Sequence, residues 1–248
     1  KDTLLLGNST GAVAVNSGTA ALHASLFAAG IGPGDRVIVP SMTYVATAHA
    51  VRYVGATPVF ADVYPDDLTI DINSINKRRK ASAVICMDYA GHPCRYWELL
   101  DYCDERRIPL IADSAHSFGA SFHSLPIGAV ADLTCFSFHP AKHITTAEGG
   151  MVTFGKASPF RKNQLDTSEW ENRLRSFRNH GRSPGSYDVS ELGFNYHMSD
   201  VHAALGINQL DKVRVQSNIH RRFEIVQQCR NRFSGIPAVQ LLDAGSDS

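Results

Sequence analysis

Short apolar segments alternate with longer amphipathic or alanine-rich segments between residues 19 and 113. The apolar segments predict strands at 36–40 (RVIVP), 57–62 (TPVFAD), 81–89 (ASAVICMDY) and 108–113 (IPLIAD). The segments before and between them predict helices at 19–30, 43–54, 71–79 and 96–107. Strands that alternate with helices are typical of βαβ units. The pattern therefore predicts an α/β fold with a mostly parallel sheet covered by helices on both faces.

The remaining residues are less regular. Residues 118–138 predict short, irregular strands, and 150–154 (GMVTF) predict one more strand. The polar segment 161–198 contains several Gly and Pro residues, which predict a helix followed by an exposed loop. From Val201 onward, apolar positions recur at helical spacing, so one long helix is expected from Ser199 to Phe233.

Composition and charge change the picture mainly by exclusion. The 248 residues are 44% hydrophobic, enough to bury a sizeable core. Lys and Arg together number 24, as do Asp and Glu, and this balance argues against a nucleic-acid partner. The basic run at 77–80 is interpreted as a solvated helix end.

The cysteines and the apolar segments bear on location. Five cysteines without a C-x-x-C pair predict neither a disulfide framework nor a zinc site, and Cys86 and Cys135 are expected in the core. No secretory signal opens the chain, and no apolar segment is long enough to span a bilayer. We therefore expect a cytoplasmic protein with no membrane partner.

A first segment with chemical potential opens the helix at 19–30. Asn16-Ser17-Gly18-Thr19-Ala20 places Gly and hydroxyl residues at a helix N-terminus, where free N–H groups and the helix dipole suit a phosphate. An ordinary N-cap explains the same residues. The segment alone does not decide between the two.

A carboxylate stands at the end of an apolar strand, in IADSAH (111–116). In doubly wound sheets, ligands bind at the carboxyl ends of the strands. Asp113 could there pair with a protonated ring nitrogen, or it could simply cap a turn.

A lysine lies in an aromatic and Gly/Thr-rich segment, FSFHPAKHITTAEGG (136–150). A lysine that is desolvated loses its proton more easily and can attack an aldehyde carbon. Lys142 is therefore a candidate nucleophile, with an exposed loop lysine as the alternative. A fourth segment, GFNYHMSD (193–200), contains Asn195 and leads into the predicted long helix, which Ser199 or Asp200 could cap.

The order of these four segments resembles the DegT/DnrJ/EryC1/StrS family of sugar aminotransferases, from about Ala12 to Val213. The resemblance implies the type I (aspartate-aminotransferase-like) fold of enzymes that use pyridoxal 5′-phosphate. It implies a large catalytic domain at 1–212, and at 213–248 a connecting helix with the start of a small C-terminal domain that is largely absent. The family's N-terminal helix is also missing.

The same resemblance implies a role for each candidate residue. Lys142 would hold the cofactor as a Schiff base, and Asp113 would partner its pyridine nitrogen. His116 would lie by its phenolic oxygen, and Tyr44 would stack on its ring. The phosphate would be bound at Gly18, Thr19, Ala20 and Ser137. Asn195 matches a position that reaches the phosphate of the neighbouring subunit, which implies a homodimer with shared sites.

The resemblance also implies a substrate class. Family members convert a keto group on a nucleotide-linked sugar to an amine, usually with L-glutamate as donor. DYAG (88–91) and ITTAEGG (144–150) are similar to enzymes that aminate C4 of UDP-linked 4-keto sugars. Four arginines of the polar segment could meet a diphosphate or could belong to a solvated helix face: Arg173, Arg175, Arg178 and Arg182.

Three rival interpretations remain. A sugar dehydratase of the same fold would have histidine in place of the lysine, so Lys142 argues against it, although His143 is the next residue. A non-catalytic relative could keep the fold without the chemistry. A dinucleotide-dependent dehydrogenase needs a G-x-G-x-x-G turn after the first strand, and none is present there.

Overall fold

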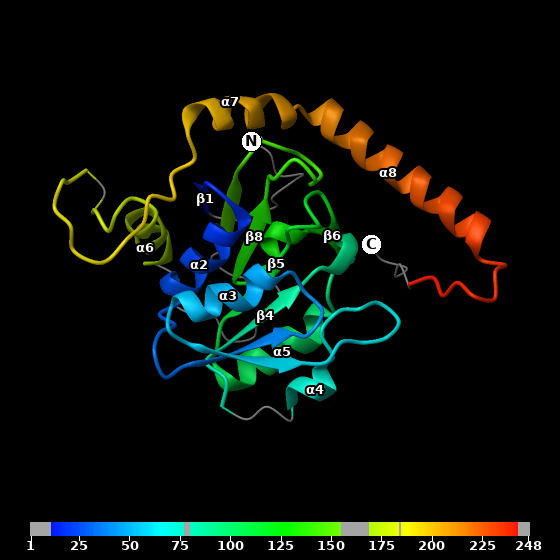
Figure 1. The fold of residues 1–248 in the computed structure, drawn as a ribbon, viewed down its shortest axis with the longest axis horizontal. Coiled ribbons are helices and arrows are strands. Elements are labelled where there is room, and N and C mark those ends of the chain that lie inside the picture. Colours follow the sequence, from blue (N-terminus) through cyan, green and yellow to red (C-terminus); the bar gives the residue numbers. More distant parts are fainter. Residues whose placement is uncertain (1–10, 77–79, 155–168, 184, 243–248) are drawn as a thin grey trace.

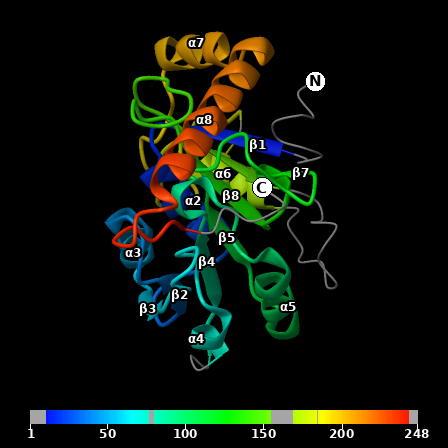
Figure 2. The same ribbon diagram turned by 90° about the vertical axis from the view of Figure 1, so that its right-hand side faces the viewer.

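A seven-stranded sheet forms the centre of the molecule in the computed structural model, which describes residues 11–76, 80–154, 169–183 and 185–242 (Figures 1 and 2). The strand order is β1-β9-β8-β5-β4-β2-β3. The strands are β1 (Gly11–Val15), β2 (Arg36–Pro40), β3 (Thr57–Ala61), β4 (Ala83–Met87), β5 (Leu110–Asp113), β8 (Leu133–Ser137) and β9 (Gly150–Phe154). The predicted strands at 36–40, 57–62, 81–89, 108–113 and 150–154 are confirmed, with shorter bounds for three of them.

The sheet is mostly parallel, as predicted. Strands β3, β2, β4, β5 and β8 pair in parallel, whereas β9 is antiparallel to both β8 and β1. The carboxyl ends of β4, β5 and β8 therefore lie at one edge of the sheet. Ligands bind at this edge in open α/β folds.

Alternate strand residues face two separate cores. Val37 and Val39 of β2 pack into one apolar cluster, and Ile38 between them packs into the other. The first cluster lies under α2 (Gly18–Ala28), α3 (Val45–Tyr53) and α6 (Trp170–Phe177). The second lies under α4 (Ile72–Asn76) and α5 (Tyr96–Arg106). This alternation explains why the strands are apolar throughout, since both of their faces are buried.

The single long helix predicted from Ser199 to Phe233 is wrong. The structure has two helices, α7 (Asp200–Gln209) and α8 (Lys212–Phe233), which meet at an angle (Figure 1). The Ser199 hydroxyl accepts from the His202 N–H and caps α7, as predicted. Asp211 separates the helices, and its carbonyl already accepts from the Val215 N–H in the first turn of α8. Asp favours helix starts over helix interiors, which accounts for the break. The prediction of one helix rested on the spacing of apolar residues, and that spacing carries no information about a polar residue such as Asp211.

Other differences are local. Strand β1 was not predicted, and 118–138 contains a two-residue hairpin, β6 (Ser121–Phe122) with β7 (Leu125–Pro126), before β8. Cys86 and Cys135 are buried, as expected. Most of the basic run at 77–80 and residues 161–168 of the polar segment lie outside the described residues.

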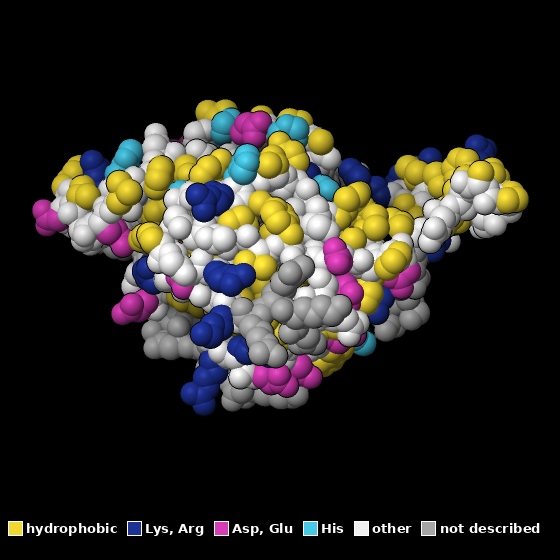
Figure 3. Space-filling model, turned by 60° about the horizontal axis from the view of Figure 1, so that its bottom comes forward, with side chains coloured by type: hydrophobic (Ala, Val, Ile, Leu, Met, Phe, Trp, Pro, Cys, Tyr) yellow, Lys and Arg dark blue, Asp and Glu magenta, His cyan; other side chains and the backbone are white. Residues whose placement is uncertain are grey.

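Helix α8 leaves the body of the molecule with apolar side chains exposed. Phe223, Ile225 and Val226 are each about half exposed, and apolar side chains cover the projecting arm at the right of Figure 3. Among the described helices, none has both the length and the apolarity needed to cross a bilayer.

Candidate active site

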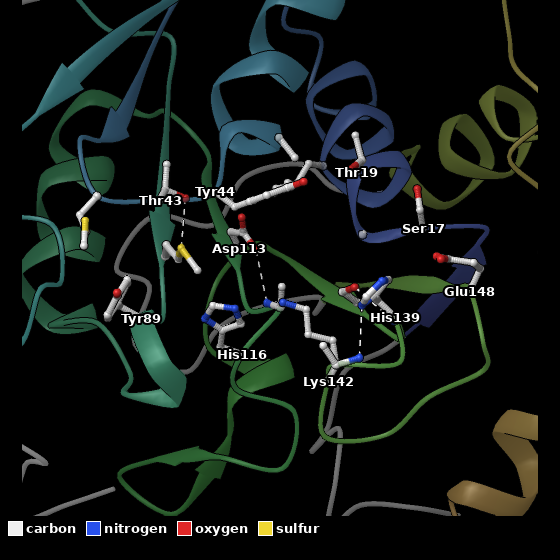
Figure 4. Close-up of a pocket in the computed structure, with 18 residues that line it drawn as sticks. Ser17, Thr19, Thr43, Tyr44, Tyr89, Asp113, His116, His139, Lys142 and Glu148 are labelled. Carbon is white, nitrogen blue, oxygen red and sulfur yellow. Dashed lines mark hydrogen bonds between the residues drawn. The ribbon is translucent and has the colours of Figure 1, made fainter.

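A pocket of about 590 Å³ opens at the carboxyl edge of the sheet (Figure 4). Its walls come from the start of α2, residues 42–46, the ends of β4, β5 and β8, and the loop that follows β8. The pocket brings together seven of the residues predicted for the site: Gly18, Thr19, Tyr44, Asp113, His116, Ser137 and Lys142. Segments that are up to 124 positions apart in sequence therefore converge on one cavity, as the resemblance implied.

Two predicted residues do not line the pocket. Ala20 is buried, and its N–H donates to the Ser17 hydroxyl at 3.0 Å, which is the N-cap interaction of α2. Asn195 is exposed, and its carbonyl accepts from the Asn16 side-chain amide at 3.1 Å. A residue that reaches a neighbouring subunit need not line the pocket of its own chain, so the role of Asn195 stays a prediction.

Asp113 ends β5 with its carboxylate buried. The Thr47 hydroxyl donates to Oδ2 at 2.7 Å, and the Ala115 N–H donates to Oδ1 at 3.3 Å. Burial raises the pKa of this carboxyl, while the two hydrogen bonds and the positive charge of Lys142 oppose the rise. Both hydrogen-bond donors are neutral, so the pocket presents a carboxylate suited to a cationic N–H.

Thr47, which was not among the predicted site residues, lies on α3 with no exposed surface. Its oxygen also lies 2.7 Å from the Thr43 hydroxyl, and Thr43 donates to the Met87 sulfur. The spacing of Thr43 and Thr47 matches one helical turn. That spacing was the only signal in the sequence, and it does not point to Asp113.

Replacing Thr47 with valine should destabilise the protein by about 1–3 kcal/mol at neutral pH, because a buried carboxylate loses its shortest hydrogen bond. The bond favours the ionised form, so its loss raises the pKa of Asp113 further, and the destabilisation should shrink as the carboxyl becomes protonated at lower pH. Urea unfolding at two pH values measures this. Thr43→Val is the matched control, because the Thr43 hydroxyl does not reach Asp113. Equal losses for both variants at both pH values would contradict the assignment.

Lys142 lies in the loop after β8, and its side chain extends across the pocket toward Asp113 and His116 (Figure 4). The Lys142 N–H donates to the His139 carbonyl at 2.9 Å in a tight turn. Partial burial lowers the pKa of the ammonium, and attraction to Asp113 opposes the shift. The side chain is therefore a better nucleophile near neutral pH than an exposed lysine.

His116 lies beside Lys142 with one ring nitrogen unpaired. Its Nδ1 is buried and has no hydrogen-bond partner within the described part of the chain. Burial lowers the pKa of the imidazole, and the Lys142 charge lowers it further. His116 also lines the pocket, and a neutral imidazole can donate to or accept from a ligand oxygen there.

The other end of the pocket can hold an anion. Ser17 caps α2, while the N–H groups of Gly18 and Thr19 belong to its first turn and have no acceptor within the helix. A Cβ at Gly18 would lie 2.9 Å from the Ser137 Cβ, so glycine allows the hydroxyl of Ser137 to approach the start of the helix. Helix start, Thr19 and Ser137 thus form a phosphate-sized cradle.

Tyr44 stands at the rim. Its side chain is 71% exposed, and it makes no side-chain capping bond although it precedes α3. A flat ring in this place could cover an aromatic ligand. With the Asp113 carboxylate, the Lys142 amine and the phosphate cradle also in its lining, the pocket fits pyridoxal phosphate, which combines a basic ring nitrogen, an aldehyde and an anion.

The four arginines of the polar segment do not line this pocket. Arg173 donates to the Ala28 carbonyl at the end of α2, and Arg175 pairs with Glu171. Arg178 donates to the Ala14 carbonyl at 2.6 Å, and Arg182 lies over the Tyr187 ring. These contacts favour the structural alternative over diphosphate binding, most clearly for Arg173 and Arg175.

His143, the residue on which a dehydratase interpretation depends, points elsewhere. It lines a small cavity under α8 with Phe118, Val215 and Ile219, whereas Lys142 lines the large pocket. The dehydratase alternative is therefore disfavoured.

Comparison with known proteins gives concordant results. GDP-perosamine synthase of Escherichia coli O157:H7 is 32% identical over 231 residues, which are 92% of this chain and 60% of that protein. The sugar aminotransferase Spr1654 of Streptococcus pneumoniae, in its PLP form, superposes with a TM-score of 0.85 and 34% identity, over 94% of this chain and 62% of that one.

A third relative is PseC of Helicobacter pylori, an aminotransferase of pseudaminic acid biosynthesis. It has a TM-score of 0.78 and 29% identity, over 91% of this chain and 59% of its own. The chain thus spans about three fifths of the length of these relatives. The model of the DegT/DnrJ/EryC1/StrS aminotransferase family matches residues 5–247. With this match over nearly the whole chain, and with the fold and pocket described above, the chain belongs to the DegT/DnrJ/EryC1/StrS aminotransferase family.

Proposed function

We propose that the protein is a cytoplasmic aminotransferase that uses pyridoxal 5′-phosphate to convert a nucleotide-linked 4-keto sugar to the 4-amino sugar, with L-glutamate as amino donor. The observation that carries this proposal is the convergence of Lys142 and Asp113 in one pocket, in a chain of an aminotransferase family. When bound, the cofactor supplies an aldehyde carbon and a pyridinium ring that accepts electrons.

Asp113 would keep the ring nitrogen protonated. Its carboxylate is buried and its hydrogen-bond donors are neutral, so a pyridinium N–H would supply the cationic partner that it lacks. Thr47 holds Oδ2 and Ala115 holds Oδ1, which fixes the plane of the carboxylate before the cofactor arrives. Preorganisation of this kind avoids reorganisation during the reaction.

Lys142 would hold the cofactor covalently through Nζ and then act as the general base. Its lowered pKa favours the neutral amine, which can take a proton from the α-carbon of the amino donor. His116, which lines the pocket, would orient the cofactor. The N–H groups of α2, with Thr19 and Ser137, would bind the phosphate, and Tyr44 would cover the ring.

We also propose a homodimer with shared sites and a domain boundary near 212. Asn195 is exposed and lies outside the pocket of its own chain, which suits a contact to the partner's phosphate. The break between α7 and α8 at residues 210–211 supports a catalytic domain at 1–212. Residues 213–248 would then hold the connecting helix, which α8 with its exposed apolar side chains suits, and the start of a small C-terminal domain.

Mixing two inactive variants of the full-length protein should restore activity if sites are shared. A Lys142→Ala subunit and an Asn195→Ala subunit together form one intact site in each heterodimer, so roughly a quarter of wild-type activity should return in a random mixture. The measurement is turnover before and after subunit exchange, with exchange verified by mass spectrometry. An Asn195→Ala dimer with wild-type turnover, or no recovery after verified exchange, would contradict sharing.

The substrate assignment can be tested directly. The full-length protein with L-glutamate should turn over UDP-, GDP- or dTDP-linked 4-keto sugars at least 100-fold faster, in kcat/KM, than simple 2-oxo acids. The similarity of DYAG and ITTAEGG points to UDP, while one relative is named for a GDP-linked product. Rapid turnover of oxaloacetate with no nucleotide sugar accepted would reject the sugar while leaving the cofactor chemistry intact.

A further inference from the structure

A second carboxylate lies behind the pocket and takes no part in the proposed chemistry. Asp88 directly follows β4 and has no exposed surface. Its Oδ1 accepts from the Cys94 N–H at 3.0 Å and from the Tyr96 hydroxyl at 2.9 Å. Its Oδ2 accepts from the hydroxyls of Ser114 at 2.6 Å and Ser117 at 2.8 Å. These four donors are all neutral, so hydrogen bonds, rather than an ion pair, compensate for the burial of this carboxylate.

The two serines mark the ends of one β-turn. The Ser117 N–H donates to the Ser114 carbonyl at 3.1 Å, which makes Ala115 and His116 the central residues. We name residues 114–117 the His116 turn. Both central residues line the pocket, and Ala115 also donates to Asp113. Asp88, which does not line the pocket, therefore joins the first and last residues of the turn through Oδ2.

The rest of the segment 88–91 supports the same turn. A Cβ at Gly91 would lie 2.8 Å from the His116 carbonyl oxygen, and Gly91 has a φ of +92°, so glycine is required on both counts. The Asp88 N–H donates to the Asp113 carbonyl at 3.2 Å. Tyr89, next to Asp88, lines the pocket. Residues 88–91 thus touch the end of β5 and both ends and the middle of the His116 turn.

We propose that Asp88 is a positioning residue that, together with Gly91, fixes the His116 turn and so places His116 and the Ala115 N–H in the pocket. This inference rests on the proposed function only for its effect on catalysis. Its structural content concerns the protein without cofactor. Hydrogen bonds to a buried carboxylate are stronger than neutral ones, which suits a group that must hold both ends of a solvent-facing turn.

The direct test follows His116 in the cofactor-free, full-length protein. A Ser114→Ala/Ser117→Ala variant removes the two bonds to the turn and leaves Asp88 with Cys94 and Tyr96. The pKa of His116 is lowered by burial and by the charge of Lys142. His143 is the other titratable group coupled to this ring, because a charge on His116 lowers the pKa of His143. Loosening the turn admits water, so we expect the pKa of His116 to rise toward its ordinary value, by about half a unit or more. NMR of labelled histidine measures it, assigned with a His116→Asn variant.

Amide hydrogen exchange gives a second readout. The N–H of Ser117 should exchange at least about tenfold faster in the double variant, while amides of β2 and α2 keep their protection. Tyr96→Phe is the matched control, because it removes a bond to the same carboxylate without touching the turn. Tyr96→Phe should lower the unfolding temperature while leaving the pKa of His116 at its wild-type value. Gly91→Ala places a Cβ against the His116 carbonyl, so it should shift the pKa of His116 although it removes no side chain that bonds to Asp88.

The outcomes separate the two proposals. If the double variant and Gly91→Ala leave the titration of His116 and the exchange of Ser117 at wild-type values, and lower only the unfolding temperature as Tyr96→Phe does, the positioning role is rejected. If His116 shifts as expected and the wild-type protein neither binds pyridoxal phosphate nor transaminates, the proposed function fails and the positioning role stands. If both hold, the double variant should lose about tenfold or more in kcat with a smaller change in the KM for glutamate.

Discussion

Replacing Lys142 with alanine in the full-length protein should lower turnover by a factor of about 10⁵ or more, because the variant loses both the covalent hold on the cofactor and the general base. The fold should survive, since Lys142 is half-buried in a loop and no described hydrogen bond depends on its side chain. Borohydride reduction followed by mass spectrometry should place the cofactor on Lys142 in the wild-type protein and on no lysine in the variant.

The pH dependence of this attachment adds a condition. Burial lowers the pKa of Lys142 below the ordinary value of 10.5, so covalent attachment should reach half its maximum below that pH. Lys80→Ala is the control, since Lys80 is exposed and lies outside the pocket. Efficient trapping on another lysine in the Lys142→Ala variant would show that the nucleophile has been assigned wrongly.

Much of this site could be predicted because its residues stand at positions with simple physical signals. Asp113 ends an apolar strand of the predicted parallel sheet, and Ser17 and Gly18 open a helix, and both are positions where ligands commonly bind. Lys142 had no such signal by itself. Its assignment depended on the resemblance of FSFHPAKHITTAEGG to a family segment, and the structure then placed it opposite Asp113.

What the sequence could not show depends on contacts between distant positions. Thr47 reaches Asp113 across 66 positions, and Ser114 reaches Asp88 across 26, and neither pair follows a periodic pattern. Burial of both partners is what makes these bonds matter, and burial of a polar residue is not readable from its neighbours in sequence. The break between α7 and α8 was also missed, because the helical spacing of apolar residues continues across Asp211 although the helix itself is interrupted there.

The DYAG segment (88–91) has a structural role that its resemblance to other enzymes did not reveal. In the sequence, it served only as a mark of enzymes that act on UDP-linked sugars. In the structure, Asp88 and Gly91 hold the His116 turn, and Tyr89 is the member of the segment whose side chain lines the pocket. The segment therefore has a structural role at the His116 turn besides its likeness to those enzymes, and within 88–91 Tyr89 is the residue that lines the pocket.

Asp113→Asn should lower turnover about 10³-fold or more while the protein stays folded and still binds cofactor. Asparagine keeps the shape and an oxygen for the Thr47 hydroxyl, so the change removes the negative charge and the longer bond from the Ala115 N–H. Without that charge, the ring nitrogen should lose its proton near neutral pH, and the ring should accept electrons poorly. The absorption spectrum of the bound cofactor as a function of pH, together with single-turnover rates with L-glutamate, measures both effects.

A matched control comes from a carboxylate that binds the opposite end of β5, the strand that Asp113 ends. Asp132 is a buried carboxylate that accepts from the Leu110 N–H at 2.7 Å, and it does not line the pocket. Asp132→Asn should cost stability, because a bond to a buried carboxylate is weakened, but should leave the single-turnover rate within about threefold of wild type. If Asp113→Asn is no slower than Asp132→Asn, the protonated ring nitrogen is not what drives the reaction. The buried carboxylate of Asp113 would then have a structural role, in which its bonds with Thr47 and Ala115 stabilise the turn that follows β5 and do not serve the cofactor.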